Sequence, residues 1–204
     1  KNVALATNAY TPGLGFARDR IMTVHHRVIA TRPLTEQEWE ISGLENWPYR
    51  LEHGSIFTHT VRRTADRRFF YRHVLGHRAF ERTDWEITAE DVAHGQRELY
   101  RRYPWLEGIP IEYEWHGVTG RTRDLWPVAG PIDDHVYIAA GFNGNGVMST
   151  HYFGHLLAHQ MLDRPHRDLH MLKAADQHPY IPGEMARHLG FQGWIRLQRL
   201  LDGR

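Results

Sequence analysis

The sequence predicts a mixed α/β protein with an antiparallel sheet, a helix that covers the sheet, and a separate strand and helix late in the chain. Three observations support this fold class. Two strand-like segments, 55–63 and 67–74, are joined by a polar turn at 64–66. A helix-start pattern follows at Thr88. The apolar strand 136–140 then leads straight into a glycine-rich loop and a helix with apolar periodicity.

Composition excludes several functional classes. Of 204 residues, 41% are hydrophobic, which is enough for a sizeable core. The net charge of +1 gives no overall field toward nucleic acid or an anionic membrane, and no apolar run approaches the roughly 20 residues of a membrane span. The absence of cysteine excludes disulfides and thiolate metal sites. It also fits a reducing compartment, so we expect a cytoplasmic protein.

The first half of the chain is predicted to hold most of the antiparallel sheet. Residues 1–5 resemble the end of a buried strand, so the chain is expected to open inside a fold, although a short edge strand at a true N-terminus remains an alternative. A long strand at 20–30 is followed by a short helix at 35–41. After the hairpin, Thr88 and Asp91 form a capping-box pattern, and the helix should continue to Pro104 and cover one face of the sheet.

The second half is predicted to alternate strands with turns before it ends in helices. A strand is expected at 109–118, a turn-rich piece at 119–130, and a helix of about four turns after the strand 136–140. Residues 163–182 should form an extended surface tail, and 194–201 a final amphipathic helix.

The glycine-rich loop at 141–146 is the strongest candidate for a binding site. A strand that feeds such a loop and then a helix places unpaired backbone N–H groups and the positive end of the helix dipole at one point, which suits an anionic oxygen. The spacing G-x-x-G-x-G differs from the dinucleotide fingerprint, and no acidic residue ends a second strand about 20 residues later. A pyrophosphate is therefore not the expected ligand, and a tight connection without ligand remains the alternative.

Several motifs in order resemble one flavoprotein family. Trp115 and Gly117 fit W-x-G, Thr122 and Asp124 fit T-x-D, 127–130 fit P-x-x-G, and 139–146 fit A-x-G-F-x-G-x-G. Together they resemble the closing segment of the D-amino-acid-oxidase-like superfamily, and most of all its sarcosine-oxidase and gamma-glutamylputrescine-oxidoreductase branches. Further matches at 6–10, 29–34 and 62–68 extend the resemblance over nearly the whole chain.

The resemblance implies FAD as the cofactor and oxidation of a CH–NH bond to an imine by hydride transfer to flavin. The glycine loop would lie under the pyrimidine edge of the flavin and donate backbone N–H groups to a carbonyl oxygen, which becomes more negative on reduction. The residues implied for cofactor binding are Gly141, Phe142, Asn143, Gly144, Asn145, Gly146, Val147 and Thr122. No catalytic side chain is assigned.

The same resemblance divides the chain into four parts. Residues 1–18 would end a segment of the FAD-binding domain, 19–110 would form the substrate-binding sheet domain, 111–163 would return to a Rossmann-like FAD-binding domain with its last strand and helix, and 164–204 would form a tail and helix. Tyr71, His73, Trp115 and Arg121 are candidate substrate contacts, with ordinary packing as the alternative.

Three departures from the family pattern qualify these expectations. No strand–G-x-G-x-x-G–helix motif occurs in the 204 residues, so we expect a missing N-terminal FAD-binding segment or a partner subunit, and a chain that is inactive alone. Met148 stands where sarcosine-oxidase relatives carry a lysine linked to oxygen activation, which leaves oxidase and dehydrogenase open. Thr119 stands where the glycine-oxidase branch has a carboxylate-binding arginine, so a larger amine is expected unless Arg121, Arg72 or Arg27 supplies the charge.

Sixteen histidines raise the alternative of a metalloprotein. His151, His155 and His159 recur at i, i+4 and i+8, a spacing able to hold zinc or nickel on one helix face. No carboxylate or cysteine accompanies them, so we expect a solvated stripe and no metal site. A second alternative is a non-catalytic fragment or subunit-interaction module that lacks the flavin site.

Overall fold

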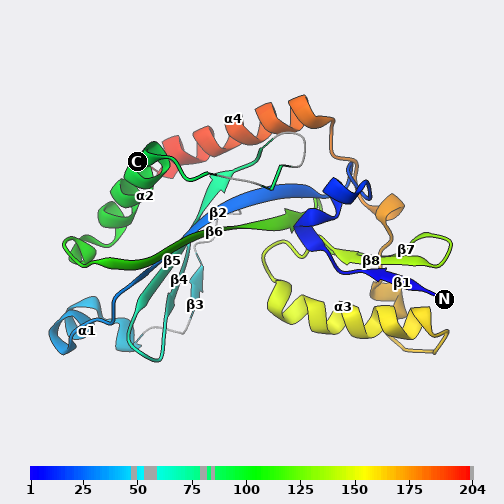
Figure 1. The fold of residues 1–204 in the computed structure, drawn as a ribbon, viewed down its shortest axis with the longest axis horizontal. Coiled ribbons are helices and arrows are strands. Elements are labelled where there is room, and N and C mark those ends of the chain that lie inside the picture. Colours follow the sequence, from blue (N-terminus) through cyan, green and yellow to red (C-terminus); the bar gives the residue numbers. More distant parts are fainter. Residues whose placement is uncertain (47–49, 53–58, 79–81, 84–85, 203–204) are drawn as a thin grey trace. The chain divides into compact units, whose positions relative to one another are not determined.

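The computed structural model describes residues 1–46, 50–52, 59–78, 82–83 and 86–202. The chain divides into two compact units, each with its own sheet and core (Figure 1). We call Lys1–Val24, Gly76–Asp84 and Val118–Arg204 the loop unit, and His25–Leu75 and Trp85–Gly117 the sheet unit.

The sheet unit is built on five strands in the order β3-β4-β5-β2-β6. Their bounds are β2 (Met22–Thr31), β3 (Arg50–Glu52), β4 (Thr60–Arg63), β5 (Phe69–Gly76) and β6 (Ile111–Arg121). Strands β3, β4 and β5 pair antiparallel, with Thr60 opposite Arg72 and Arg63 opposite Phe69. The predicted hairpin is confirmed for its described part, while 53–58 lie outside the described residues. Strand β3 was not predicted.

One face of this sheet is covered by α2 (Ala89–Arg102), as predicted. Phe69 and Tyr71 of β5 share a buried core with Leu99 of α2. Successive strand residues point to opposite faces, so Phe70 lies on the other face, where its ring meets Trp115 edge-on with 5.6 Å between ring centres. We call these the covered face and the open face.

Both helices of the sheet unit begin with a capping box, which the sequence predicted for α2. In α1 (Glu36–Ser42), the Thr35 hydroxyl accepts the Glu38 backbone N–H, and the Glu38 carboxylate accepts the Thr35 N–H in return. Thr88 and Asp91 make the same reciprocal pair at the start of α2. Each pair satisfies two of the four N–H groups that a helix start leaves without partners.

The loop unit contains a three-stranded sheet in the order β1-β8-β7. β1 (Val3–Leu5) runs parallel to β8 (Val136–Ala140), and β7 (Val128–Asp133) runs antiparallel to it. The strand predicted at 1–5 exists, but its predicted burial is wrong, since Val3 is 52% exposed. The physical reason is that β1 lies at the edge of the sheet and contacts a neighbouring strand on one side only.

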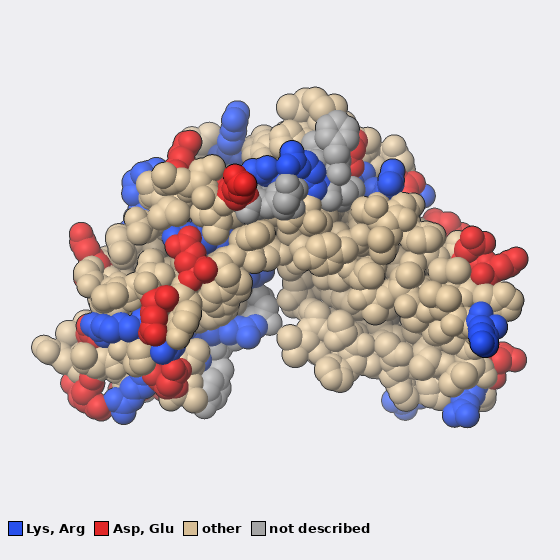
Figure 2. All heavy atoms as spheres, viewed as in Figure 1, with Lys and Arg blue, Asp and Glu red and all other residues tan. Residues whose placement is uncertain are grey.

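Helix α3 (Gly146–Met161) follows β8 through the glycine loop, as predicted, and it packs on the small sheet. Phe153 and Leu157 of α3 share a core with Ala129 of β7 and Phe142 of the loop. The helix has no Lys, Arg, Asp or Glu in its 16 residues. Figure 2 accordingly shows an almost uncharged surface at the position of α3.

Three predictions for the second half of the chain need correction. The segment 119–130 is less turn-rich than predicted, because β6 extends to Arg121 and β7 begins at Val128. The predicted surface tail 163–182 contains two short 3-10 turns and ends in the buried Ile181, whose N–H donates to Asp19. Helix α4 (Glu184–Asp202) begins ten residues before the predicted position, where Arg187 is buried and held by backbone carbonyls.

Among the helices of the described residues, none is long and apolar enough to cross a membrane. Lys and Arg are interspersed with Asp and Glu on the face drawn in Figure 2, which agrees with the net charge of +1.

Candidate functional site

The loop between β8 and α3 turns through three left-handed residues. Gly141 has φ 70°, Asn143 has φ 57° and Gly144 has φ 88°. Residues other than glycine and asparagine rarely adopt these backbone φ angles. At Gly141 space is also limiting, because a Cβ would lie 2.9 Å from Cγ2 of Thr122. Residue identity therefore fixes the path of this loop.

Two asparagine side chains hold the loop in place. Oδ1 of Asn8 accepts hydrogen bonds from the backbone N–H of Gly141 and of Phe142, at 3.1 and 3.3 Å. Asn143 donates from Nδ2 to the Gly141 carbonyl at 2.6 Å, and its Oδ1 accepts the N–H of Thr122 at 2.9 Å. Side chains thus take the place of the backbone hydrogen-bond partners that this loop would otherwise lack.

The helix start that follows is left without a cap. The Asn145 side chain makes no capping hydrogen bond to α3. The first hydrogen bond of the helix runs from Ser149 N to Asn145 O, and no described residue accepts a hydrogen bond from the N–H of Gly144, Gly146 or Val147. These three donors and the positive end of the helix dipole together suit an anionic oxygen.

An apolar surface lies beside these free donors. Val147 and Met148, in the first turn of α3, are 82% and 75% exposed. Exposed neighbouring apolar side chains are a common feature of surfaces that bind a ligand or another protein. The combination of free N–H donors with an apolar flank suits a planar group with a polar edge.

Only some of the residues predicted to bind the cofactor have a backbone N–H group that is not already donated to another residue. The N–H groups of Gly141 and Phe142 already donate to Asn8, that of Asn143 donates to Gly120, and that of Asn145 donates to Phe142. Thr122 is buried, and its N–H and hydroxyl contact Asn143. Cofactor binding by these residues stays a prediction, with Gly144, Gly146 and Val147 as the remaining donors.

The predicted substrate contacts are distributed over different surfaces. Tyr71 lies in the core of the covered face, where burial raises the pKa of its hydroxyl. His73 lies on the same face, beside Gly95 of α2. Trp115 is 44% exposed on the open face, and Arg121 is buried in the loop unit. The sheet unit therefore does not bring Tyr71 and His73 together with Trp115, and their substrate role stays a prediction.

Sequence reasoning did not identify the anchor of the tail. The Asp124 carboxylate pairs with the Lys173 ammonium and accepts from Nδ1 of the buried His178 at 3.1 Å. Burial raises the pKa of Asp124, but the hydrogen bonds from Lys173 and His178 outweigh it and hold the pKa at about 2. Sequence separation of about 50 residues hides this cluster, since no local pattern links its members.

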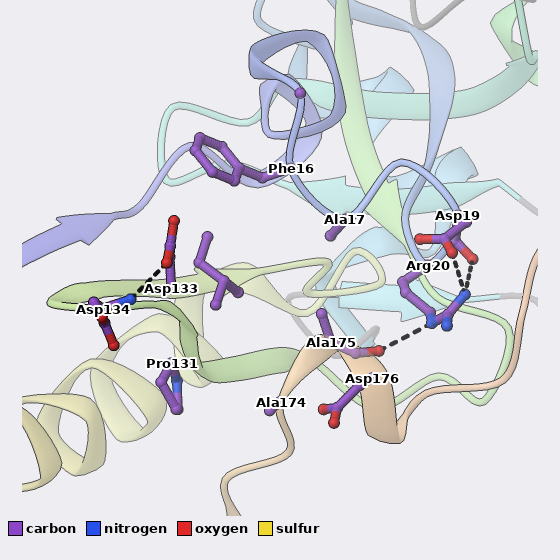
Figure 3. Close-up of a pocket in the computed structure, with 12 residues that line it drawn as sticks. Phe16, Ala17, Asp19, Arg20, Pro131, Asp133, Asp134, Ala174, Ala175 and Asp176 are labelled. Carbon is purple, nitrogen blue, oxygen red and sulfur yellow. Dashed lines mark hydrogen bonds and ion pairs between the residues drawn. The ribbon is translucent and has the colours of Figure 1, made fainter.

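The loop unit contains a cavity of about 780 Å³ (Figure 3). It is lined by four carboxylates, Asp19, Asp133, Asp134 and Asp176, and by Arg20. The Arg20 guanidinium is occupied by Asp19 and by the Ala175 carbonyl. None of the residues predicted to bind cofactor or substrate lines this cavity.

Comparison with known proteins identifies the family. A family model described as FAD dependent oxidoreductase (DAO) matches residues 1–160. The chain is 29% identical over 168 residues to a probable oxidoreductase OrdL of Haemophilus influenzae, covering 79% of this chain and 36% of that protein. It is 30% identical over 163 residues to gamma-glutamylputrescine oxidoreductase of Escherichia coli, covering 78% of this chain and 36% of that protein.

Solved structures share the fold. Glycine oxidase from Geobacillus kaustophilus superposes with a TM-score of 0.61 at 17% identity, over 81% of this chain and 42% of that one. L-proline dehydrogenase from P. horikoshii gives 0.59 at 21% identity, over 79% and 42%. The chain spans about 36% of the length of the curated relatives named above. With the family model matched over residues 1–160, the chain belongs to the DAO family of FAD-dependent oxidoreductases.

Proposed function

We propose that this chain is part of an enzyme that oxidises the CH–NH bond of an amine or amino-acid derivative to the imine, by hydride transfer to FAD. The observation that carries the proposal is the uncapped start of α3, where Gly144, Gly146 and Val147 present N–H groups without acceptors. The name of the E. coli relative, gamma-glutamylputrescine oxidoreductase, supports an amine substrate.

The residues present fit a flavin at this place. Three backbone donors without acceptors lie at or near the exposed Val147 and Met148 in the chain, so a planar apolar group with an electronegative edge would find both kinds of contact. When bound, FAD supplies the hydride acceptor of the reaction. The loop donors and the helix dipole would stabilise negative charge at the edge of the reduced ring, and Asn8 and Asn143 would keep those donors aligned.

For the substrate, we propose an extended or secondary amine rather than a small free amino acid. Thr119 stands where a carboxylate-binding arginine is expected, and a hydroxyl cannot replace the bidentate charge contact of a guanidinium. Met148 carries no charge at the position linked to oxygen activation, so we favour transfer of electrons to an acceptor other than dioxygen.

We further propose that FAD binding needs a segment outside these 204 residues, in the same protein or in a partner subunit. The chain corresponds to 36% of the H. influenzae and E. coli relatives and contains no G-x-G-x-x-G motif. Strand β1 lies at the edge of its sheet with Val3 52% exposed, so a further strand has a place to pair.

The test is to express the complete coding sequence beside the 204-residue chain and record flavin absorbance after purification. We expect a yellow complete protein and a colourless short chain. Anaerobic bleaching of the flavin by a series of amines then ranks substrates, with secondary or extended amines ahead of glycine and D-alanine. Fastest reduction by glycine would overturn the substrate proposal.

The alternative is a non-catalytic module that lacks the flavin site. The absence of the dinucleotide motif from the 204 residues favours it. A complete protein that remains colourless after incubation with FAD, and whose folding is intact by circular dichroism, would establish this alternative in place of the oxidoreductase.

A further inference from the structure

Three histidines gather at the C-terminal end of α3. His155 and His159 are one turn apart on the helix, and His166 comes from the loop that follows it. Their ring centres are 4.7 Å apart for His155 and His159, 4.9 Å for His159 and His166, and 5.3 Å for His155 and His166. His151, the first member of the stripe predicted from sequence, has no ring contact with this cluster and instead makes a hydrogen bond from Nδ1 to the Val147 carbonyl.

The spacing of these rings matches three imidazoles around one metal ion. With a metal–nitrogen distance of about 2.0–2.1 Å, each ring centre lies about 3.2 Å from the ion, and a tetrahedral angle separates two ring centres by about 5.2 Å. The three observed separations lie within about half an ångström of that value. The positions of the rings therefore suit a three-histidine site with a fourth place for water.

The rings have suitable positions, but their nitrogens do not point to one common ion. As the side chains stand, the described residues include no group of three His, Asp or Glu side chains arranged to hold a metal ion. Rotation about the Cβ–Cγ bond turns the nitrogens of a histidine but leaves its ring centre nearly in place, because that axis passes through the ring. A bound ion would thus need the rings to rotate from the positions described here.

The hydrogen bonding of two ring nitrogens in the cluster leaves them able to bind a metal ion after such a rotation. Nδ1 of His159 is buried and has no hydrogen-bond partner among the described residues, an arrangement that costs free energy unless a ligand compensates. Nδ1 of His166 accepts the N–H of Asp168 at 3.1 Å, so this nitrogen has the lone pair that a metal requires. Ligation would exchange that hydrogen bond for a metal bond.

We infer that His155, His159 and His166 form a binding site for a borderline transition-metal ion of the zinc or nickel class. Neutral imidazoles suit such ions, and α3 has no carboxylate that would favour magnesium or calcium. The ion would tie the loop 162–168 to the end of α3. This inference is independent of the proposed oxidoreductase activity.

The experiment titrates the untagged 204-residue chain with Zn²⁺ and Ni²⁺ by calorimetry, with Mg²⁺ as a control ion. The wild-type chain should bind one equivalent of Zn²⁺ and gain thermal stability from it, because a ligand of the folded state shifts unfolding by mass action. His166→Gln and His155→Gln should each weaken Zn²⁺ binding at least tenfold. The matched control His151→Gln, on the same helix, should bind within twofold of wild type.

The same variants separate this site from a helix stripe. If the stripe His151, His155 and His159 holds the ion, His151→Gln will lose affinity while His166→Gln will not, and the inference is then wrong. It is equally wrong if the wild-type chain shows no saturable binding of Zn²⁺ or Ni²⁺ at one equivalent. His155 is exposed, so its substitution leaves folding intact even if that of His166 does not.

Discussion

The glycine loop and the covered face of the five-stranded sheet are stabilised in different ways. The loop presents backbone N–H groups, and its left-handed residues Asn143 and Gly144 give it a path that few other residues could follow. The covered face buries side chains, with Arg27 fully buried against Gly95 of α2. The loop therefore depends on backbone conformation, whereas the covered face depends on close packing.

Gly95→Val should have the largest effect, because it tests packing on the covered face. A Cβ at Gly95 would lie 2.6 Å from Nη1 of Arg27 and 2.7 Å from Cε1 of His73, so both side chains would have to shift, and Arg27 is fully buried. We expect the free energy of unfolding in urea to fall by about 3 kcal/mol.

The matched control is Gly154→Ala in α3, where nothing lies within 4 Å of the added Cβ. That variant should gain about 0.5–1 kcal/mol from helix propensity. Equal stability of the Gly95 and Gly154 variants would show that the covered face is loosely packed.

Asn8→Ala tests the loop in the same way. It removes the acceptor for the N–H groups of Gly141 and Phe142 and leaves both without a partner, which costs about 2 kcal/mol of unfolding free energy. Asn8→Asp keeps the oxygen acceptor and should retain most of the stability. Hydrogen exchange of the Gly141 and Phe142 amides is the direct measurement, and unchanged protection in Asn8→Ala would contradict the role given to this side chain.

A third prediction concerns Asp124, whose charge anchors the tail rather than the loop. Its pKa is lowered from 3.8 to about 2 in the folded state, so its stabilisation is fully present above pH 4 and is lost as the pH falls toward 2. We expect Asp124→Asn to lower the unfolding free energy by about 1–2 kcal/mol at pH 7. The difference from wild type should shrink below pH 4, and a difference that stays constant to pH 2 would count against the ion pair.

The smallest expected effect belongs to His77, a fully buried side chain of the loop unit. Burial lowers its pKa below 6.5, and Nδ1 donates to the Thr23 carbonyl at 2.7 Å. Burial of the neutral ring is therefore fully compatible with folding above pH 6.5. As the pH falls below 6.5, the unfolded chain takes up a proton that the folded chain does not, and the free energy of unfolding decreases by less than about 1.4 kcal/mol per pH unit. His77→Asn keeps a donor but cannot titrate, so its unfolding free energy should vary less between pH 7 and 5.5.

The sequence was most informative where a local chemical pattern sets the structure. The capping box at Thr88 located the start of α2, and the apolar run 136–140 with its glycines located β8, the loop and α3. Each of these patterns acts within a few residues, so no knowledge of distant contacts is needed.

Sequence was least informative where packing between distant segments decides the outcome. Phe70 and Tyr71 are both large aromatic residues, so the sequence does not show which of the two faces α2. The structure shows that it is Tyr71, because Tyr71 shares a core with Leu99 of α2. A shift of one residue reverses the faces of a strand, so the sequence alone left open whether Tyr71 and His73 contact substrate or pack in the core. The sequence also could not predict which backbone N–H groups of the loop lack an acceptor, because this depends on the positions of the Asn8 and Asn143 side chains.

The central proposal is that the loop donors bind the flavin, and Gly144→Val in the complete flavin-containing protein tests it most directly. Gly144 has φ 88°, so a β-branched side chain forces the loop to a new path and displaces its free N–H groups. Loss of one donor to developing negative charge predicts anaerobic flavin reduction slowed by about a hundredfold, while Gly154→Ala stays within twofold of wild type. Reduction at the wild-type rate by folded Gly144→Val protein, with flavin affinity unchanged, would contradict it.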